Sequence, residues 1–238
     1  MHTVLLRNAD LSAETPAPLA REQSHHIANV LRLKPGAAIR VLDGAGSSRE
    51  AQLTAVSKNK INFAFRGRVT TLPRAGVEIT LFQCVAKAAR MDWLVEKATE
   101  LGVARIVPVL SERVVVGANV ERWNRIAEAA ICQCGGGWMP EISPALKWDA
   151  TLAAIRDFDG VVYTGSLMPD AKPFSLQPSA ISLAFLIGPE GDFTPHEYES
   201  ATTAGALPVS FGPQVMRVET AAIYAVCATF AISGLKRM

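Results

Sequence analysis

Leu186-Ile187-Gly188-Pro189-Glu190-Gly191-Asp192-Phe193 is the stretch that decides the fold expected for this chain. It ends a short apolar run, residues 181–187, that predicts a strand buried in a sheet. The two glycines that follow can adopt backbone angles closed to other residues, and the proline between them fixes φ. Residues 194–197 are Thr-Pro-His-Glu, which is typical of a helix N-cap, a first-turn proline and an acidic first turn. The predicted order is therefore strand, rigid loop, helix.

This loop lies where α/β proteins bind ligands, outside the carboxyl end of a strand, and few side chains separate its backbone amides from a ligand. Taken alone, the loop is explained as well by an ordinary glycine-rich turn. A second segment repeats the pattern, because residues 206–211 predict a strand, Gly212-Pro213 ends it, and residues 219–221 begin a long helix. Two successive units of this kind favour a ligand site.

The two C-terminal motifs resemble those of RsmE-type ribosomal RNA methyltransferases of the SPOUT superfamily, which methylate N3 of a uridine in small-subunit (16S) ribosomal RNA. The motifs are residues 187–191 with Phe193 and Glu197, and Phe211-Gly212 leading to residues 216–221. Shorter matches follow the same order along nearly the whole chain: His26, Val30-Leu31-Arg32, Gly36, Lys87, residues 97–103, Ile106, Pro108, Glu112-Arg113, Gln133 and Pro140-Glu141-Ile142. The resemblance implies an enzyme that depends on S-adenosylmethionine (SAM).

The resemblance also implies the domain organisation. It assigns a PUA-like RNA-binding β-barrel to residues 1–72 and a SPOUT α/β domain to residues 73–238, with a C-terminal trefoil knot that bends SAM into a cleft. SPOUT domains form homodimers in which the cleft borders both subunits. The knot is expected only through the resemblance, because connection rules argue against knots in general. Residues 219–235 are apolar on nearly every side, as a helix buried in a dimer or a knot requires.

The residues themselves also indicate two parts, with a boundary near residues 72–76, where proline and glycine interrupt the pattern. Before it, tight turns separate short strands, which favours a small barrel; the expected elements are a helix at 21–31 and strands at 38–42, 51–56 and 61–69. After it, strands alternate with helices, which predicts a mainly parallel sheet covered on both faces. The expected strands are at 77–85, 104–110 and 160–164, and the helices at 91–101, 120–131 and 150–158.

Composition is that of a soluble globular protein, since 49% of the 238 residues are apolar and 19% are charged. The N-terminal residues lack the features of a signal peptide and no long apolar run suggests a membrane segment, so we expect a cytoplasmic protein. Four cysteines are too few for a disulfide scaffold, and Cys84 and Cys227 are expected in the core. Cys132-Gln133-Cys134 lacks the usual spacing for zinc, so no metal is expected.

Positive charge is concentrated at the N-terminal end. Through residue 75 the chain has 11 Lys and Arg against 5 Asp and Glu, whereas the remainder has 13 against 17. Such a segment attracts phosphates without recognising sequence, although a solvated surface is the alternative. The expected partner is small-subunit ribosomal RNA or the 30S subunit. The candidate RNA-binding residues are Arg7, Arg32, Arg40, Lys58, Lys60, Arg66, Arg68 and Lys87.

Methylation of a ring nitrogen requires a bound donor, an in-line nucleophile and removal of the nitrogen's proton, so positioning supplies much of the rate. Arg217 could stabilise charge on the uracil or hold a phosphate, and Glu219 could act as base or orient Arg217. Alternatively, the two form an ordinary ion pair at a helix N-terminus. The candidate SAM-binding residues are Gly165, Ile187, Gly188, Pro189, Glu190, Gly191, Phe211, Gly212, Met216 and Thr220.

Some positions depart from the family pattern. Charged residues are replaced at Cys132 and Gly136, an arginine is replaced by Gln214, and a second loop glycine is replaced by Asp192. The missing charges at Cys132, Gly136 and Gln214 motivate a second hypothesis, a ribosome-associated RNA-binding protein of the same fold with weak or lost catalysis. A third is a SPOUT methyltransferase acting on another RNA, such as tRNA. A Rossmann dehydrogenase is disfavoured, because the candidate glycine motif at residues 44–46 lies between predicted strands instead of opening a helix.

Overall fold

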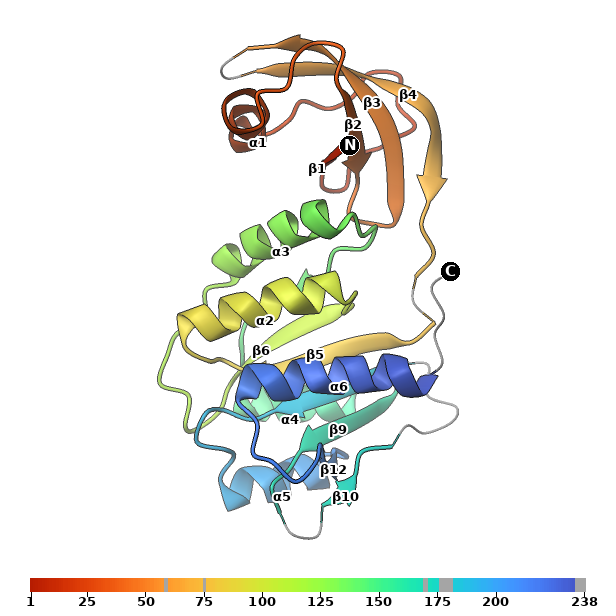
Figure 1. The fold of residues 1–238 in the computed structure, drawn as a ribbon. Helices are drawn as coiled ribbons and strands as arrows, with labels where there is room; N and C mark the ends of the chain where they lie inside the picture. The colour runs from red at the N-terminus through yellow and green to blue at the C-terminus, as the bar shows by residue number, and fades with distance from the viewer. Residues whose placement is uncertain (58–59, 75, 169–170, 176–181, 234–238) are drawn as a thin grey trace. The chain divides into compact units, whose positions relative to one another are not determined.

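The computed structural model describes residues 1–57, 60–74, 76–168, 171–175 and 182–233 (Figure 1). The chain divides into two compact units, Met1–Arg74 with Glu128–Met139, and Ala75–Ala127 with Pro140–Met238. Helix α3 (Val120–Cys134) therefore begins in the second unit and ends in the first. The first unit thus includes the segment Glu128–Met139. The change of sequence pattern near residue 72 does not predict that this later segment belongs to the first unit.

The first unit contains a four-stranded sheet in the order β1-β2-β3-β4. Strands β1 and β2 are parallel and the other pairs are antiparallel. The three expected strands are confirmed, and β1 is an addition; the bounds are β1 (His2–Leu5), β2 (Ala38–Leu42), β3 (Ser47–Val56) and β4 (Ile61–Thr71). The predicted first helix is α1 (Arg21–His25) continued by a π-helical turn, η1 (His26–Val30). Closure of the sheet into a barrel stays a prediction.

The turn between β2 and β3 fixes the end of the segment Glu128–Met139. A Cβ atom added to Gly46, whose φ is +98°, would lie 2.2 Å from Cζ2 of Trp138, so only glycine allows this indole to lie against the turn. The indole nitrogen of Trp138 donates a hydrogen bond of 3.0 Å to the carbonyl of Leu72, and the Arg74 guanidinium lies 4.6 Å from the ring centroid. The turn at Gly46, the indole of Trp138 and the residues Leu72 and Arg74 thus form one packed cluster.

The second unit contains a parallel sheet in the order β10-β12-β9-β11-β5-β6-β7, with β8 also pairing with β6. The bounds are β5 (Glu78–Cys84), β6 (Arg105–Leu110), β7 (Glu141–Ile142), β8 (Leu146–Lys147), β9 (Val161–Gly165), β10 (Lys172–Pro173), β11 (Ser182–Ile187) and β12 (Leu207–Ser210). The predicted parallel sheet is confirmed. Strand β12 pairs with β9 although β11 comes between them in the sequence. The trefoil knot stays a prediction.

Helices cover both faces of this sheet, as expected from its continuous apolar strands (Figure 1). Helices α2 (Ala88–Glu100) and α6 (Val218–Ser233) pack on each other, and α6 also contacts β5 and β11. Helices α4 (Trp148–Arg156) and α5 (Pro195–Thr203) contact each other on the opposite side. Four successive residues of β11, from Leu183 to Leu186, are fully buried because both faces are covered.

Helix α5 begins at the predicted N-cap. Thr194 and Glu197 form a capping box, in which the backbone N–H of Glu197 donates to Thr194 Oγ1 at 3.2 Å and the N–H of Thr194 donates to Glu197 Oε2 at 2.9 Å. The second carboxylate oxygen, Oε1, accepts a 2.8 Å hydrogen bond from the N–H of Glu112. Through these hydrogen bonds the buried Glu197 caps α5 and connects this helix to the segment after β6.

Glu197→Ala is expected to lower the free energy of unfolding by about 3 kcal/mol, because two N–H groups lose their acceptor in a buried place. Urea denaturation of the variant and the wild type measures the change. Glu199→Ala, which removes an exposed carboxylate from the same helix, is the matched control and should leave the midpoint nearly unchanged. Equal midpoints for the two variants would contradict the assignment.

Helix α6 leaves one apolar face uncovered in the single chain. Cys84 is buried as expected, but the prediction for Cys227 is wrong, because this residue lies exposed on α6. Tyr224 and Ile232 on the same helix are 44% and 53% exposed. Leu235, the predicted end of the helix, lies outside the described residues. None of the helices in the described part of the chain is long and apolar enough to cross a membrane.

Candidate active site

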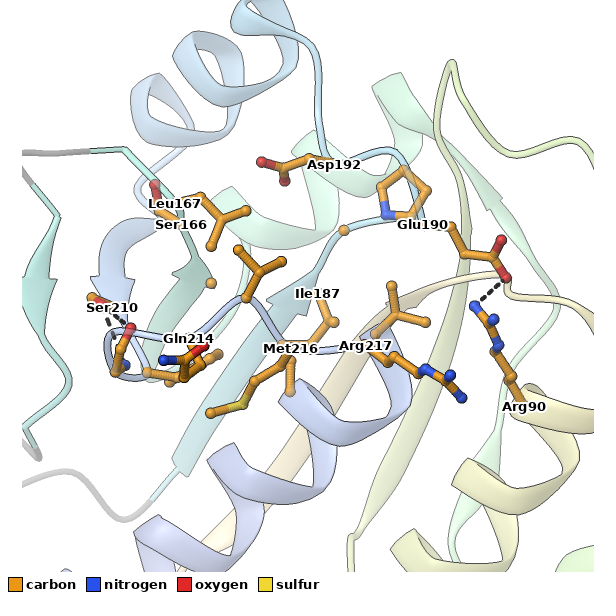
Figure 2. A pocket seen from close by; sticks show the side chains of 18 residues that line it. Arg90, Ser166, Leu167, Ile187, Glu190, Asp192, Ser210, Gln214, Met216 and Arg217 are labelled. Atoms are coloured by element: carbon orange, nitrogen blue, oxygen red, sulfur yellow. Dashed lines mark hydrogen bonds and ion pairs between the residues drawn. The ribbon is translucent and has the colours of Figure 1, made fainter.

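Three neighbouring strands of the second unit end at one edge of the sheet, and the loops after them enclose a pocket of about 330 Å³ (Figure 2). Strands β12, β9 and β11 are adjacent and parallel, so their carboxyl ends meet. The lining residues are Arg90, Gly165, Ser166, Leu167, Ile187, Gly188, Pro189, Glu190, Asp192, Ser210, Phe211, Gly212, Gln214, Val215, Met216, Arg217, Val218 and Ala221.

The pocket contains most of the residues that the sequence nominated for SAM, although the structure does not test that role. Those that line it are Gly165, Ile187, Gly188, Pro189, Glu190, Phe211, Gly212 and Met216. Gly191 and Thr220 are not among its lining residues. Of the two predicted catalytic residues, Arg217 lines the pocket, whereas Glu219, on α6, is not among its lining residues. The two successive glycine loops thus line one site.

An aromatic ring lies against the glycine that ends β9. A Cβ atom added to Gly165 would lie 2.9 Å from Cε2 of Phe211. The Phe211 ring is in turn surrounded by the rings of Phe174, Phe185 and Tyr224, with centroids 6.0, 6.3 and 5.8 Å away. The phenyl ring therefore has little room to retreat, and this wall of the pocket depends on glycine at position 165.

The loop after β11 is held by an arginine that the resemblance motifs include. Nη1 of Arg113 donates hydrogen bonds to the carbonyl of Gly191 and, at 3.3 Å, to that of Asp192. Asp192 has φ of +61°, a left-handed conformation that glycine adopts more readily. The resemblance implies glycine at this position, which would adopt this angle without strain, and the loop has the angle here with an aspartate.

Charged residues at the pocket form a chain of ion pairs. Nη1 of Arg90 lies 2.7 Å from Glu190 Oε1, and Nζ of Lys87 lies 3.8 Å from Oε2 of the same carboxylate. Nε of Arg90 is also 3.9 Å from Oε1 of Glu219, whose Oε2 is buried without a hydrogen-bond partner among the described residues. Glu219 therefore pairs with Arg90, and the alternative of an ordinary Arg217–Glu219 ion pair is not observed.

Arg217 forms no ion pair with any residue in the described ranges. Its side chain lines the pocket together with Arg90, whose guanidinium is occupied by Glu190 (Figure 2). The pocket thus has one arginine engaged by carboxylates and another whose charge is available to a ligand.

Several lining residues were not nominated from the sequence. Arg90 lies one helical turn after Lys87, so its approach to the loop after β11 depends on the packing of α2 against α6. Ser166 and Leu167 directly follow Gly165, which the sequence predicted as a SAM-binding residue. Their position next to Gly165 is the sequence feature that could have indicated them. Gln214 was noted only as a departure, yet it lies in the pocket wall.

The candidate RNA-binding residues are exposed wherever the structure describes them. In the first unit they are Arg7, Arg32, Arg40, Lys60, Arg66 and Arg68, and in the second Lys87. Lys58 lies outside the described residues. Arg7 is 3.6 Å from the carboxylate of Glu128, and Arg66 donates to Oε1 of Gln52 at 3.0 Å. Exposure agrees with a role in phosphate binding without testing it.

Residues 73–229 match the family model described as an RNA methyltransferase domain. The chain belongs to this RNA methyltransferase family. Residues 19–65 match a second model, an RNA methyltransferase PUA domain. The family resemblance seen in the sequence is confirmed. So is the α/β fold class, in which a PUA-like β-sheet domain precedes a parallel, SPOUT-like α/β domain.

Known relatives of this RNA methyltransferase share nearly its whole length. The ribosomal RNA small subunit methyltransferase E of Bacillus subtilis is 28% identical over 221 residues, covering 87% of this chain and 86% of the relative. The structure of the same-named enzyme from Neisseria gonorrhoeae, bound to S-adenosyl methionine, has a TM-score of 0.87 and 29% identity, covering 97% of each chain. The Legionella pneumophila protein Lpg2936, in complex with bound SAM, has a TM-score of 0.88 and 26% identity, covering 96% of each chain.

Proposed function

We propose that this RNA methyltransferase transfers a methyl group from SAM to N3 of a uridine in small-subunit (16S) ribosomal RNA. The observation that supports this most directly is the pocket made by the loops after β9, β11 and β12. Two similar structures contain SAM, and the similar curated proteins are small-subunit methyltransferases. The cytoplasm, where ribosomal subunits are assembled, is the proposed location.

The residues of the pocket fit SAM. Backbone groups of Gly188 and Gly212, which line the pocket, suit the hydrogen bonds of a nucleoside, and the side chains of Leu167, Ile187 and Val215 offer apolar surface to its base. When bound, SAM supplies an electrophilic methyl group on a sulfonium. Of the remaining candidates, Gly191 would act by holding the loop, since its carbonyl accepts a hydrogen bond from Arg113, and Thr220 lies exposed in the first turn of α6.

Arg217 and Glu219 are the proposed catalytic residues. A uracil nitrogen attacks only after losing its proton, and the resulting negative charge is stabilised by a nearby cation. Arg217 lines the pocket without an ion pair to any residue of the described ranges, so its charge is available for this purpose. Glu219 does not line the pocket, but one of its carboxylate oxygens is buried without a partner among those residues, so as proton acceptor it would act through an intervening water.

The alternative is an RNA-binding protein with weak or lost catalysis. Two departures, Asp192 and Gln214, line the pocket, and at position 214 the resemblance implies an arginine. Cys132 and Gly136 belong to the segment Glu128–Met139 of the first unit. The loss of a cation at position 214 therefore concerns the proposed site itself, which makes methyl transfer the property to measure.

Mass mapping of methylated uridines tests the proposal. Small-subunit ribosomal RNA from a deletion strain should lack one N3-methyluridine, and expression of this chain should restore it. Purified protein should likewise transfer labelled methyl groups from SAM to 30S subunits. Binding to SAM and to subunits without any transfer would support the RNA-binding alternative, and transfer to tRNA alone would redirect the proposal to another substrate.

We propose that the first unit supplies RNA affinity through its exposed cations. Binding of a small-subunit RNA fragment should weaken steeply with salt, since each neutralised phosphate releases counterions. Arg66→Glu with Arg68→Glu reverses two exposed charges on β4 and should weaken RNA binding further while leaving SAM affinity unchanged. Filter binding across a salt series measures the first effect and calorimetry the second. RNA binding that does not depend on salt would contradict this role.

We propose that the protein is a homodimer that uses the uncovered face of α6. Tyr224, Cys227 and Ile232 expose apolar surface on this helix, as a subunit interface requires. Light scattering should give twice the chain mass of 25.5 kDa. Tyr224→Glu with Ile232→Glu should shift the protein to the monomer, whereas His196→Glu with Thr203→Glu, at two exposed positions of α5, should not. A wild-type monomer at micromolar concentration would contradict the dimer.

A further inference from the structure

Asp192 provides a negative charge in the pocket that no described residue neutralises. Two carboxylates line the pocket, and the other, Glu190, is paired with Arg90 and Lys87. Oδ1 of Asp192 accepts hydrogen bonds of 2.8 Å from the N–H of Phe193 and of 2.8 Å from the hydroxyl of Tyr198. Its second oxygen, Oδ2, accepts none from the residues that the structure describes, and is therefore available to a ligand.

The position of this carboxylate is fixed by its neighbours. Arg113 holds the carbonyl of Asp192, and the Tyr198 hydroxyl, besides donating to Oδ1, lies 3.2 Å from the carbonyl of Gly165. Burial and the Asp192 carboxylate raise the pKa of Tyr198, so the phenol keeps its proton and remains a donor. The Tyr198 hydroxyl thus connects Asp192, after β11, with Gly165 at the end of β9, and a ligand would meet the carboxylate already oriented.

The arrangement of charges indicates which part of a ligand faces Asp192. In Figure 2 Asp192 lies on the side of Ser166 and Leu167, away from Arg217 and Arg90. The methionine part of SAM ends in a carboxylate, which favours the end of the pocket with arginines. The nucleoside part is then directed to the end of the pocket where Asp192 lies.

We infer that Asp192 binds the ribose hydroxyls of the cofactor, an assignment that rests on the proposed SAM site. An ionised carboxylate only accepts hydrogen bonds, and the vicinal hydroxyls of ribose present two donors side by side. Acidic side chains bind ribose hydroxyls in the same way at other nucleotide sites beside parallel sheets. Because the family has glycine at this position, Asp192 adds a specificity-determining side chain where the backbone alone would otherwise meet the nucleoside.

A ligand pair tests the assignment on the full-length protein. Calorimetry is done with S-adenosylhomocysteine, the demethylated product, and with its 2′,3′-dideoxy analogue, for the wild type and for Asp192→Gly. Glycine suits the φ of +61°, so the variant removes the carboxylate without straining the loop. The wild type should prefer the hydroxylated ligand by about tenfold or more, the size typical of hydrogen bonds to a charged group, and the variant should lose most of that preference.

Two further variants separate recognition from support of the loop. Asp192→Asn keeps the size but removes the charge, and should retain only part of the preference. Tyr198→Phe removes a hydrogen bond of the pocket wall but leaves the carboxylate, and should keep the preference even where overall affinity falls. If Asp192→Gly weakened both ligands equally, the ribose assignment would be overturned while the SAM site survived. If the wild type bound neither ligand, the SAM proposal would fail, and this assignment with it.

Discussion

Arg217→Ala is expected to bind SAM within a few-fold of the wild type and to methylate its target uridine about 10²-fold or more slowly. The guanidinium has no ion pair in the described part of the chain and lines the pocket, so its charge serves a ligand and not the fold. It favours the deprotonated uracil more than the neutral one, and therefore acts on the transition state. Calorimetry with SAM and single-turnover transfer to 30S subunits measure the two quantities separately.

The matched control is Arg105→Ala, which removes an exposed arginine of the same unit whose partner is Glu141, outside the pocket. It should change neither quantity. Normal methylation by Arg217→Ala would leave the enzyme proposal standing but overturn the role of Arg217. A wild type that binds SAM and subunits yet transfers nothing would favour the RNA-binding alternative, with Gln214 as the first residue to examine by Gln214→Arg.

The glycine loops were predictable because their signal is local. A buried strand, two glycines, a proline and an N-cap follow one another within residues 181–197, and each has a direct backbone consequence. The parallel sheet was predictable for the same reason, since continuous apolar strands alternate with helices. The exposed state of Cys227 was not, because an apolar helix has the same sequence whether its own chain or another surface covers it.

Contacts between distant segments account for the rest. Nothing near Arg90 in the sequence indicates that it meets both Glu190 and Glu219, which lie 100 or more residues further along. The same holds for the placement of Glu128–Met139 with the first unit, which depends on Trp138 packing against Gly46. The sequence marks Asp192 only as a departure from glycine. The structure shows that Phe193 and Tyr198 both donate to one of its carboxylate oxygens, Oδ1, which leaves the other without a partner among the described residues.

Gly165→Val is expected to weaken SAM binding by up to about 100-fold. The first added carbon would already lie 2.9 Å from the Phe211 ring, and two further methyl groups increase the overlap. Since the rings of Phe174, Phe185 and Tyr224 surround Phe211, the strain is relieved by moving its ring, and that ring is a wall of the pocket. Overpacking of this kind costs about 1–3 kcal/mol, which corresponds to losses of up to about 100-fold in affinity.

A compensating change distinguishes this cause from general unfolding. Phe211→Leu reduces the ring to a smaller, more flexible side chain, so the double variant Gly165→Val with Phe211→Leu should recover part of the lost SAM affinity. Calorimetry on the wild type, the two single variants and the double variant gives the coupling free energy between the two positions in SAM binding. This coupling is zero if the two substitutions act independently. Thermal melting of the same proteins supplies the control, because a variant that had lost its fold would show no cooperative transition. If Gly165→Val left SAM affinity unchanged, SAM binding would not depend on this wall of the pocket. The proposal that SAM binds at the end of β9 would then be wrong.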